Sequence, residues 1–252
     1  MMLVARQPPT AGWIAHDLPA ADLIPAHAHP RGHLVYAASG VFSLATDHGS
    51  WIAPRNRVAW TPARFEHAHR SHGRTDLRVV FLPDPAAARL PDRPAVLRMS
   101  GLAREAILAL TGTRTYDPAA RARLRLVLVG ELDEVPEQPL HLPRPHDDRL
   151  RAVTDALESD PADPATLDEL GKRAGTSART LSRLFAHELG MSFYHWRTEL
   201  RVHQALILLA QGHTSTHTAH HCGWSNPSSF ISAFRRIVGI TPSHYRTLQQ
   251  PT

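Results

Sequence analysis

Three histidines stand close together near the N-terminus, in the stretch HAHPRGHLVYAASG at residues 27–40. His27, His29 and His33 precede an apolar run that is typical of a β-strand. Side chains an even number of residues apart point to the same face of an extended chain, so all three share one face if the strand runs back that far. Converging neutral imidazoles suit a divalent first-row metal such as zinc, nickel, copper or iron. The stretch indicates either such a metal site or ordinary polar residues at a strand entrance.

The second chemical feature is an uneven distribution of charge. Residues 171–252 contain nine basic and two acidic residues, whereas the whole chain carries a formal net charge of +5. Residues 171–252 therefore have a net charge of +7, and residues 1–170 a net charge of −2. A basic segment attached to a nearly neutral one is the electrostatic pattern expected of a nucleic-acid-binding protein.

Composition limits the class of protein. The single cysteine, Cys222, excludes an internal disulfide framework and fits a reducing cytosol. No apolar run has the length of a membrane span, and the N-terminal MMLVARQPPTAGW has no sustained apolar segment of the signal-peptide kind. We therefore expect a soluble cytoplasmic protein with no membrane partner.

The elements that must position these residues change in character along the chain. Short apolar runs separated by proline and glycine over residues 10–85 predict strands of an antiparallel barrel or sandwich. Helical spacing predicts helices near 97–112 and 117–134, and a proline-rich stretch then predicts a linker. The expected fold is α+β in two domains, namely a β-barrel followed by helices at 1–135, a linker at 136–146 and an all-α domain at 147–252.

The all-α part begins with a helix-turn-helix pattern. Thr166 and Glu169 have capping-box spacing, Gly175 permits a tight turn, and Ser177 can cap a second helix. A basic, hydroxyl-rich outer face remains on that second helix, made of Arg179, Thr180, Ser182 and Arg183.

The same pattern occurs a second time. Gly223 is the turn glycine, Asn226 the N-cap and Pro227 the first helical residue. The outward residues of this helix include Ser228, Ser229, Ser232, Arg235 and Arg236. The two outward helices begin 49 residues apart and are separated by a stretch at 192–212 that reads as one long helix. A rigid spacer of this kind could hold both helices on one side of a duplex, in major grooves about 34 Å apart.

Residues 147–248 resemble the DNA-binding domain of the AraC/XylS family of bacterial transcription regulators. The resemblance rests on LGKRAGTSARTLSRLFAHELGMSFYHWRTELRVHQALILLAQG and on CGWSNPSSFISAFRRIVGITPSHYR, with its Gly-x-Thr-Pro ending. It implies that the second helix of each pair reads bases, with more discrimination from the first pair because arginine can bond guanine bidentately. The expected DNA-binding residues are Ser177, Arg179, Thr180, Ser182, Arg183, Asn226, Pro227, Ser228, Ser229, Ser232 and Arg236.

Two further expectations concern this domain. Phosphate contacts from Arg173, Arg197 and Arg236 should make DNA affinity steeply dependent on salt. The stretch STHTAHHCG departs from the family by carrying His217, His220, His221 and Cys222 where core residues are usually aliphatic. A zinc site is one interpretation. A second helix pair that packs more loosely, with some of these side chains used for packing, is the preferred one.

The opening stretch also resembles the first motif of the cupin barrel, in the pattern His27-x-His29-x3-His33-x6-Gly40. APRNRVAWTPARFEH resembles the second motif and ends at His67. The resemblance implies a metal site formed by His27, His29, His33 and His67. Three interpretations stay open, namely a bound metal, a metal-free pocket for an organic effector, and purely structural histidines. His69 and His72 are expected to be solvated loop residues.

Together these patterns predict a transcription regulator rather than an enzyme. Its cupin-like domain would sense a small molecule or a metal ion, and its second domain would bind operator DNA. A homodimer is expected through the helices near 97–112 and 117–134, and a contact with RNA polymerase if the protein activates. Catalytic cupins commonly have a carboxylate at the position of His33, which weakens the alternative of a metalloenzyme, a dioxygenase or isomerase with a helical assembly domain.

Overall fold

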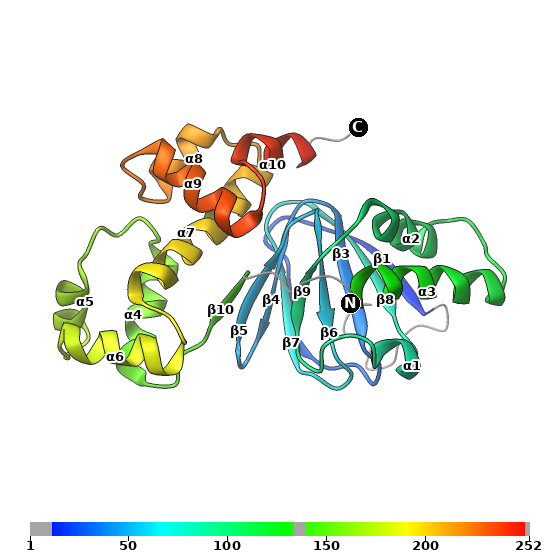
Figure 1. Cartoon of the computed structure of the whole chain (residues 1–252), viewed down its shortest axis with the longest axis horizontal. Helices are drawn as coiled ribbons and strands as arrows, with labels where there is room; N and C mark the ends of the chain where they lie inside the picture. Colours follow the sequence, from blue (N-terminus) through cyan, green and yellow to red (C-terminus); the bar gives the residue numbers. More distant parts are fainter. Residues whose placement is uncertain (1–11, 134–139, 250–252) are drawn as a thin grey trace. The chain divides into compact units, whose positions relative to one another are not determined.

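The computed structural model describes residues 12–133 and 140–249, and these divide into two compact units after residue 141 (Figure 1). The N-terminal unit contains antiparallel sheets followed by helices, and the second unit is helical. The predicted two-part α+β fold is confirmed at this level. Residues 136–139 of the predicted linker lie outside the described residues, and the domain limits stay predictions. Within the described ranges, no helix combines the length and apolar character needed to cross a membrane.

The N-terminal unit is built on two five-stranded sheets. Their strand orders are β1-β8-β3-β6-β9 and β10-β5-β4-β7-β2. Pairing is antiparallel throughout the first sheet and along β5-β4-β7-β2 of the second. The strands are β1 (Trp13–Leu18), β2 (Leu23–His27), β3 (His33–Ser39), β4 (Phe42–Thr46), β5 (Gly49–Ala53), β6 (Arg57–Thr61), β7 (His67–Ser71), β8 (Thr75–Phe81), β9 (Ala95–Arg98) and β10 (His141–Pro143).

Alternation along β3 shows how the first sheet separates two environments. Leu34 and Tyr36 belong to an apolar core that also includes residues of the following helices. Their neighbours His33 and Val35 line the space between the sheets instead. A β-strand sends successive side chains to opposite faces, so the strand that buries Leu34 against helices must direct His33 toward the second sheet.

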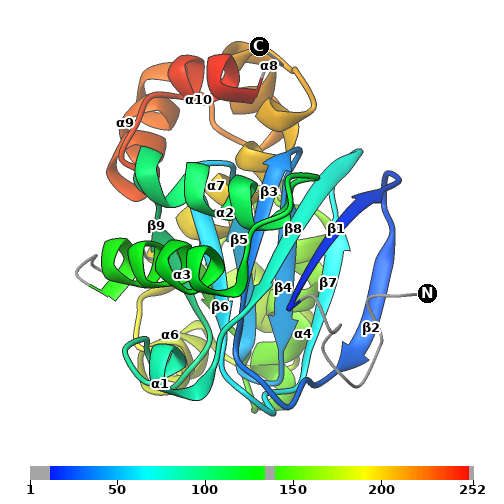
Figure 2. The same cartoon turned by 90° about the vertical axis from the view of Figure 1, so that its right-hand side faces the viewer.

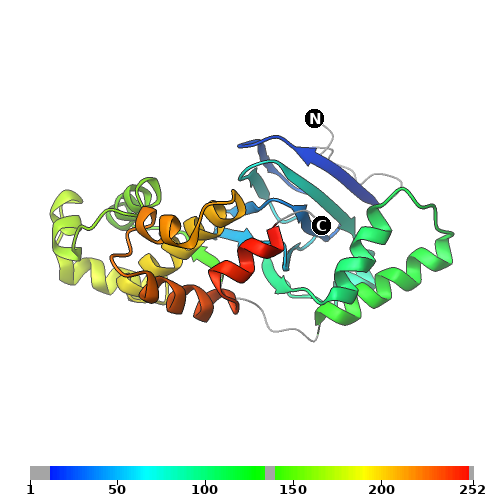
Figure 3. The ribbon, with the colours of Figure 1, turned by 90° about the horizontal axis from the view of Figure 1, so that it is seen from above.

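Helices α2 (Gly101–Thr111) and α3 (Pro118–Asp133) pack against each other and cover the outer face of the first sheet (Figures 2 and 3). The short helix α1 (Asp84–Ala87) precedes β9. The helix expected near 97–112 begins later than predicted, because residues 95–98 form β9 and pair with β6. Ser100 then caps α2 by accepting a hydrogen bond from the backbone N–H of Ala103.

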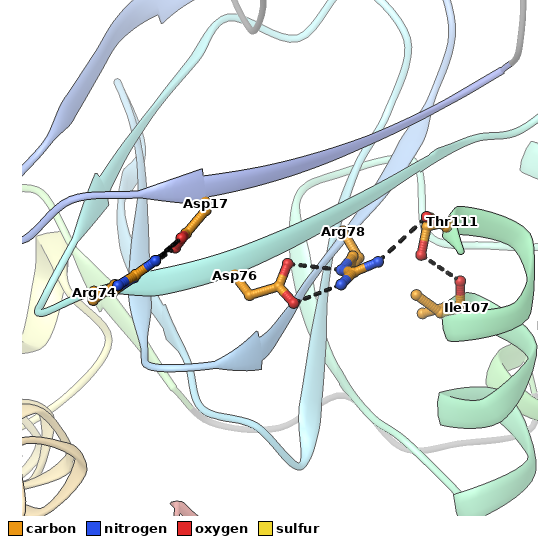
Figure 4. A network of polar contacts seen from close by, with 6 residues as sticks. All are labelled: Asp17, Arg74, Asp76, Arg78, Ile107 and Thr111. Atoms are coloured by element: carbon orange, nitrogen blue, oxygen red, sulfur yellow. Dashed lines mark hydrogen bonds and ion pairs between the residues drawn. The ribbon is translucent and has the colours of Figure 1, made fainter. Parts of the chain in front are cut away.

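A polar network fixes α2 to the first sheet (Figure 4). Arg78 on β8 forms an ion pair with Asp76 at 2.6 Å and donates to the backbone carbonyl of Thr111 at 3.3 Å. The Thr111 hydroxyl donates to the Ile107 carbonyl at 2.8 Å, within α2. The end of α2 is therefore held at a defined place on the sheet by a charged donor.

The second unit follows the predicted helix signals closely. Its helices are α4 (Asp148–Ser159), α5 (Leu167–Arg173), α6 (Ala178–Glu188), α7 (Phe193–Ala210), α8 (Ser215–His221), α9 (Pro227–Val238) and α10 (Pro242–Gln249). The capping box at Thr166 and Glu169 is confirmed, with both reciprocal hydrogen bonds present. Ser177 and Asn226 cap α6 and α9 as predicted, by accepting from the backbone N–H of Thr180 and Ser228.

Helix α7 packs with both groups of helices in this unit (Figure 1). Trp196 and Leu200 join the core of α4–α6, which includes Leu181 and Phe185. In the other group, the ring of Phe234 lies between Phe230 and Tyr245, with centroid distances of 5.7 and 5.8 Å. The predicted spacer helix at 192–212 is thus a packed element that joins two helix pairs.

Candidate functional site

Five histidines gather at one end of the N-terminal unit. His27 ends β2 in the second sheet and His33 begins β3 in the first, so the chain crosses between the sheets at residues 28–32. The expectation that His27, His29 and His33 share one face of a single strand is therefore wrong. His67 joins them because it lies opposite His27 in the β2–β7 pairing, and His69 follows two residues later. We call these five residues the histidine cluster.

Local packing determines the path of the corner that carries His29. The backbone N–H of Arg64 donates to the His29 carbonyl at 2.6 Å, and Arg64 itself has a left-handed conformation with φ of 63°. Such a φ is uncommon for a residue other than glycine and is maintained only by surrounding structure. Gly32 lies against the indole of Trp60, where any Cβ would overlap the ring. The corner therefore requires glycine immediately before His33.

The rings of the histidine cluster are in mutual contact. His67 lies at the centre, with centroid distances of 4.4 Å to His27, 4.8 Å to His33, 5.0 Å to His69 and 5.5 Å to His29. Two groups of three residues have one nitrogen each within 4.8 Å of the others and could hold a metal ion. These groups are His27, His67 and His69, and His29, His33 and His67.

Hydrogen bonds determine the tautomer of two of these rings. Nδ1 of His27 lies 2.8 Å from the Pro25 carbonyl, and Nδ1 of His67 lies 2.8 Å from the Phe65 carbonyl. A carbonyl oxygen only accepts, so both Nδ1 atoms carry the proton and donate it. The lone pair of each neutral ring is therefore on Nε2. A ring that donates one N–H to a backbone carbonyl and keeps the other nitrogen free is the usual arrangement of a metal-binding histidine.

Burial favours the neutral form of three members of the cluster. The pKa of His67 is lowered from 6.5 to about 4, chiefly by desolvation and also by His27 and His29, against the opposing effect of the Phe65 hydrogen bond. Burial, followed by the nearby histidines, also holds the pKa of His33 and of His69 well below 6.5. Among the described residues, both nitrogens of His33 and Nε2 of His67 have no hydrogen-bond partner. Buried, neutral nitrogens without a partner are suitable donors for a cation.

The expectation that His69 and His72 are solvated loop residues is wrong. His69 lies in the middle of β7 with 3% of its surface exposed and belongs to the cluster. His72 is half-buried and shares a 3.0 Å hydrogen bond with the Ser43 hydroxyl, and burial lowers its pKa to about 4. The signal for His69 was present, because HAHRS alternates in the same way as a strand with one buried face.

Two spaces of very different size adjoin the cluster. The inner cavity, between His33, His69 and Phe81, has a volume of about 10 Å³. A groove of about 540 Å³ lies on the outer side, where it is lined by His27, His29, Arg64 and Glu66 among others. The inner cavity has room for about one water-sized particle, which is too small for an organic molecule.

The second candidate site is the outer face of α6 and α9. On α6, Arg179, Ser182 and Arg183 are exposed, whereas Leu181 and Phe185 are buried. On α9, the exposed residues include Ser228, Ser229, Ser232, Arg235 and Arg236, next to the cap residue Asn226. Ser177 and Asn226 use their side-chain oxygens as helix caps, Thr180 is half-buried and bonded to Ser177, and Pro227 is half-buried. The predicted DNA-binding residues thus divide into exposed side chains and residues that begin the helices.

Comparison with known proteins identifies the chain. Residues 170–247 match a family model described as a helix-turn-helix domain. The chain is 32% identical over 224 residues to the HTH-type transcriptional regulator NimR of Escherichia coli, an alignment that covers 88% of this chain and 81% of that protein. The chain belongs to the AraC/XylS family of transcription regulators. The prediction of a regulator rather than an enzyme is confirmed by this relationship.

Two more relatives match part of this AraC-family regulator. The HTH-type transcriptional regulator RipA of Corynebacterium glutamicum is 43% identical over 117 residues, which cover 46% of this chain and 34% of that protein. A crystal structure of a transcriptional regulator with an AraC-type DNA-binding domain from Chromobacterium violaceum is 30% identical. That match covers 41% of this chain and 95% of the solved one, with a TM-score of 0.39.

The structure corrects one expected phosphate contact of this AraC-family regulator. Arg197 is 8% exposed, and its guanidinium donates to the carbonyls of Asp163 and Ala165 in the loop before α5. Its predicted role in binding phosphate is therefore wrong, because its donors serve the protein backbone. Arg173 is exposed but forms an ion pair with Asp163 at 2.6 Å, and Arg236 is exposed on α9.

The group of His217, His220, His221 and Cys222 does not form one site in this AraC-family regulator. Helix α8 buries Thr218 and Ala219, and Cys222 behind it is fully buried, whereas all three histidines are exposed. Burial also raises the pKa of the Cys222 thiol to about 12, so it remains protonated. The expectation that some of these four side chains serve packing is confirmed by Cys222, which is fully buried, whereas the three histidines are exposed.

Proposed function

We propose that this AraC-family regulator binds specific operator DNA through α6 and α9 and responds to a divalent transition metal held by the histidine cluster. The observation that carries the metal part is the convergence of five imidazoles, mostly buried, two of which have Nδ1 bonded to a backbone carbonyl and Nε2 left for a ligand. His27, His29, His33 and His67 are the proposed ligands, with His69 beside them. We also infer that the two sheets form a cupin-like barrel, in which this corner is the ligand-bearing end.

Cavity size favours a metal over an organic effector at the centre of the cluster. A space of about 10 Å³ accommodates one ion or one water, and no organic molecule of ordinary size. The donor set consists of nitrogens only, which suits zinc, nickel, copper or iron better than magnesium or calcium. An organic effector would have to lie in the outer groove beside Arg64 and Glu66.

The chain's own residues explain how metal occupancy can be sensed. His33 belongs to the first sheet and His27 and His67 to the second, with His29 in the corner between them. Coordination of one ion by these nitrogens would therefore cross-link the two sheets. Without it, the partnerless nitrogens of His33 and His67 destabilise the closed corner. Two arrangements of the corner with different metal affinities would be sufficient for a population shift.

For DNA binding, the proposal assigns base reading to α6 and α9. Arg179 and Arg183 project from α6 and can bond guanine bidentately, whereas the serines of α9 discriminate less between bases. The remaining expectations are parts of the same proposal. They are a homodimer through α2 and α3, a cytoplasmic location and, for an activator, a contact with RNA polymerase.

Elemental analysis of the full chain tests the metal site. Protein purified without chelators and then dialysed against zinc should retain one ion at the cluster. A double variant with His27→Ala and His29→Ala should lose that ion. His48→Ala is the matched control, because His48 is exposed at the turn between β4 and β5 of the same unit. Equal zinc content in all three proteins would contradict the metal proposal and leave the outer groove as the effector site.

A further inference from the structure

Three histidines form a row on the surface of the helical unit and share no residue with the histidine cluster. His213, His217 and His221 are all exposed. The ring of His217 lies 4.7 Å from that of His213 and 5.7 Å from that of His221, with interplanar angles of 19° and 16°. We call these residues the histidine stripe. His217 and His221 are four residues apart within α8, the spacing that places side chains on one face of a helix, and His213 lies just before that helix.

The stripe has no packing role. The buried residues of α8 are Thr218 and Ala219, which lie on the other side of the helix. Within the described part of the chain, the ring nitrogens of the stripe make no hydrogen bond or ion pair. Three exposed, neighbouring imidazoles without such contacts are not needed for folding, so the pattern points to a ligand that imidazoles recognise.

The spacing of the rings suits a shared cation. A Zn–N bond of about 2.0–2.1 Å and tetrahedral geometry place the centroids of two coordinated imidazoles about 5 Å apart. The two neighbouring pairs of the stripe, at 4.7 and 5.7 Å, are close to that value already. Two histidines four residues apart on a helix are also the arrangement by which helical metalloproteases hold zinc. Because His221 lies in the last turn of α8, the negative end of the helix dipole favours a cation there.

We propose that the histidine stripe binds one divalent transition-metal ion, such as zinc, nickel or copper, through His217 together with His213 or His221. Cys222 takes no part, since it is buried. The site is separate from the histidine cluster and does not depend on the function proposed for it. It places a cation-responsive element on the first helix of the second helix pair.

His217→Ala is the decisive variant, because His217 belongs to both neighbouring pairs of the stripe. His220→Ala is its control, since His220 is exposed on the same helix but makes no ring contact with the stripe. The full chain of each protein is dialysed against zinc alone, and bound zinc per chain is measured. Circular dichroism of each variant checks that the exposed substitution leaves the helices intact.

The expected result is one zinc ion fewer per chain in His217→Ala than in the wild type, with no loss in His220→Ala. This difference holds whether or not the histidine cluster binds zinc, because both proteins contain that cluster. A repeat in the His27→Ala/His29→Ala background should again show the loss of one ion. Equal zinc content in wild type and His217→Ala would overturn the proposal, as would an equal loss in His217→Ala and His220→Ala.

Discussion

Replacement of His33 by leucine should stabilise the metal-free protein. His33 is 1% exposed, and neither ring nitrogen has a hydrogen-bond partner among the described residues. An unsatisfied buried polar group costs about 1–3 kcal/mol, and a leucine of similar volume removes that cost. In the presence of a chelator, His33→Leu is therefore expected to raise the free energy of unfolding by about 1–3 kcal/mol.

Added zinc should increase the free energy of unfolding more for the wild type than for His33→Leu. At a free zinc concentration 100 times the dissociation constant, the wild type gains about 2.7 kcal/mol. Loss of one ligand should weaken binding at least about 100-fold, a larger effect than that of a lost second-shell partner. The variant then gains only about 0.4 kcal/mol at the same zinc concentration.

Urea denaturation of the full chain with chelator and with zinc measures both quantities. His48→Leu, an exposed substitution in the same unit, should change neither. The reasoning is refuted if His33→Leu destabilises the chelated protein, because the His33 nitrogens would then have partners in the native state. It is also refuted if zinc stabilises wild type and His33→Leu equally.

Three other predictions follow from the same structure. His72→Gln keeps a hydrogen-bonding side chain beside Ser43 but removes a histidine whose pKa is lowered to about 4. The unfolded wild type binds a proton at His72 below pH 6.5 while the native state does not, so acid destabilises it. Between pH 7 and pH 4 it should lose up to about 3 kcal/mol more than the variant in urea titrations, and parallel pH curves would contradict this. Arg183→Ala should reduce by about 1–3 kcal/mol the difference in binding free energy between a duplex selected by the wild type and random DNA, as measured by fluorescence anisotropy. Arg173→Ala should instead weaken binding to both duplexes by the same factor. Gly223→Ala should destabilise the helical unit more than Gly175→Ala. Both glycines have a left-handed φ, but only at Gly223 would the new Cβ lie 2.9 Å from the backbone of Ala162, and equal urea midpoints would exclude that clash.

Local signals in the sequence were sufficient for the helical unit. Thr166, Ser177 and Asn226 cap their helices as predicted, because a cap depends on a side chain and a backbone N–H only two or three residues away. Leu181, Phe185 and Phe234 lie at helical spacing and are buried, and helical periodicity is likewise a local signal. Helix pairs with short turns could therefore be located without knowledge of tertiary structure.

The histidine cluster needed information that the local sequence does not contain. His27 and His33 lie in different sheets, and their approach depends on a corner that is fixed by Gly32 under Trp60 and by Arg64. His69 was missed because the end of a strand is hard to place, although its alternation with His67 was visible. Arg197 was misassigned for a related reason, because a basic residue on an amphipathic helix is assumed to be solvated until a partner such as the Asp163 carbonyl is seen.

The most direct test of the central claim is the affinity of the full chain for a selected operator duplex, measured by fluorescence anisotropy with chelator and with zinc. The wild type should change its affinity on addition of zinc, because the histidine cluster couples metal occupancy to DNA binding. All proteins are compared in the His217→Ala background, so that the histidine stripe does not contribute to the zinc response. In that background the His27→Ala/His29→Ala variant should bind the duplex with the same affinity in both buffers, while His48→Ala should respond as the protein with the intact cluster does. An equal response of wild type and double variant to zinc, or no response in either, would contradict a metal-sensing role for the cluster.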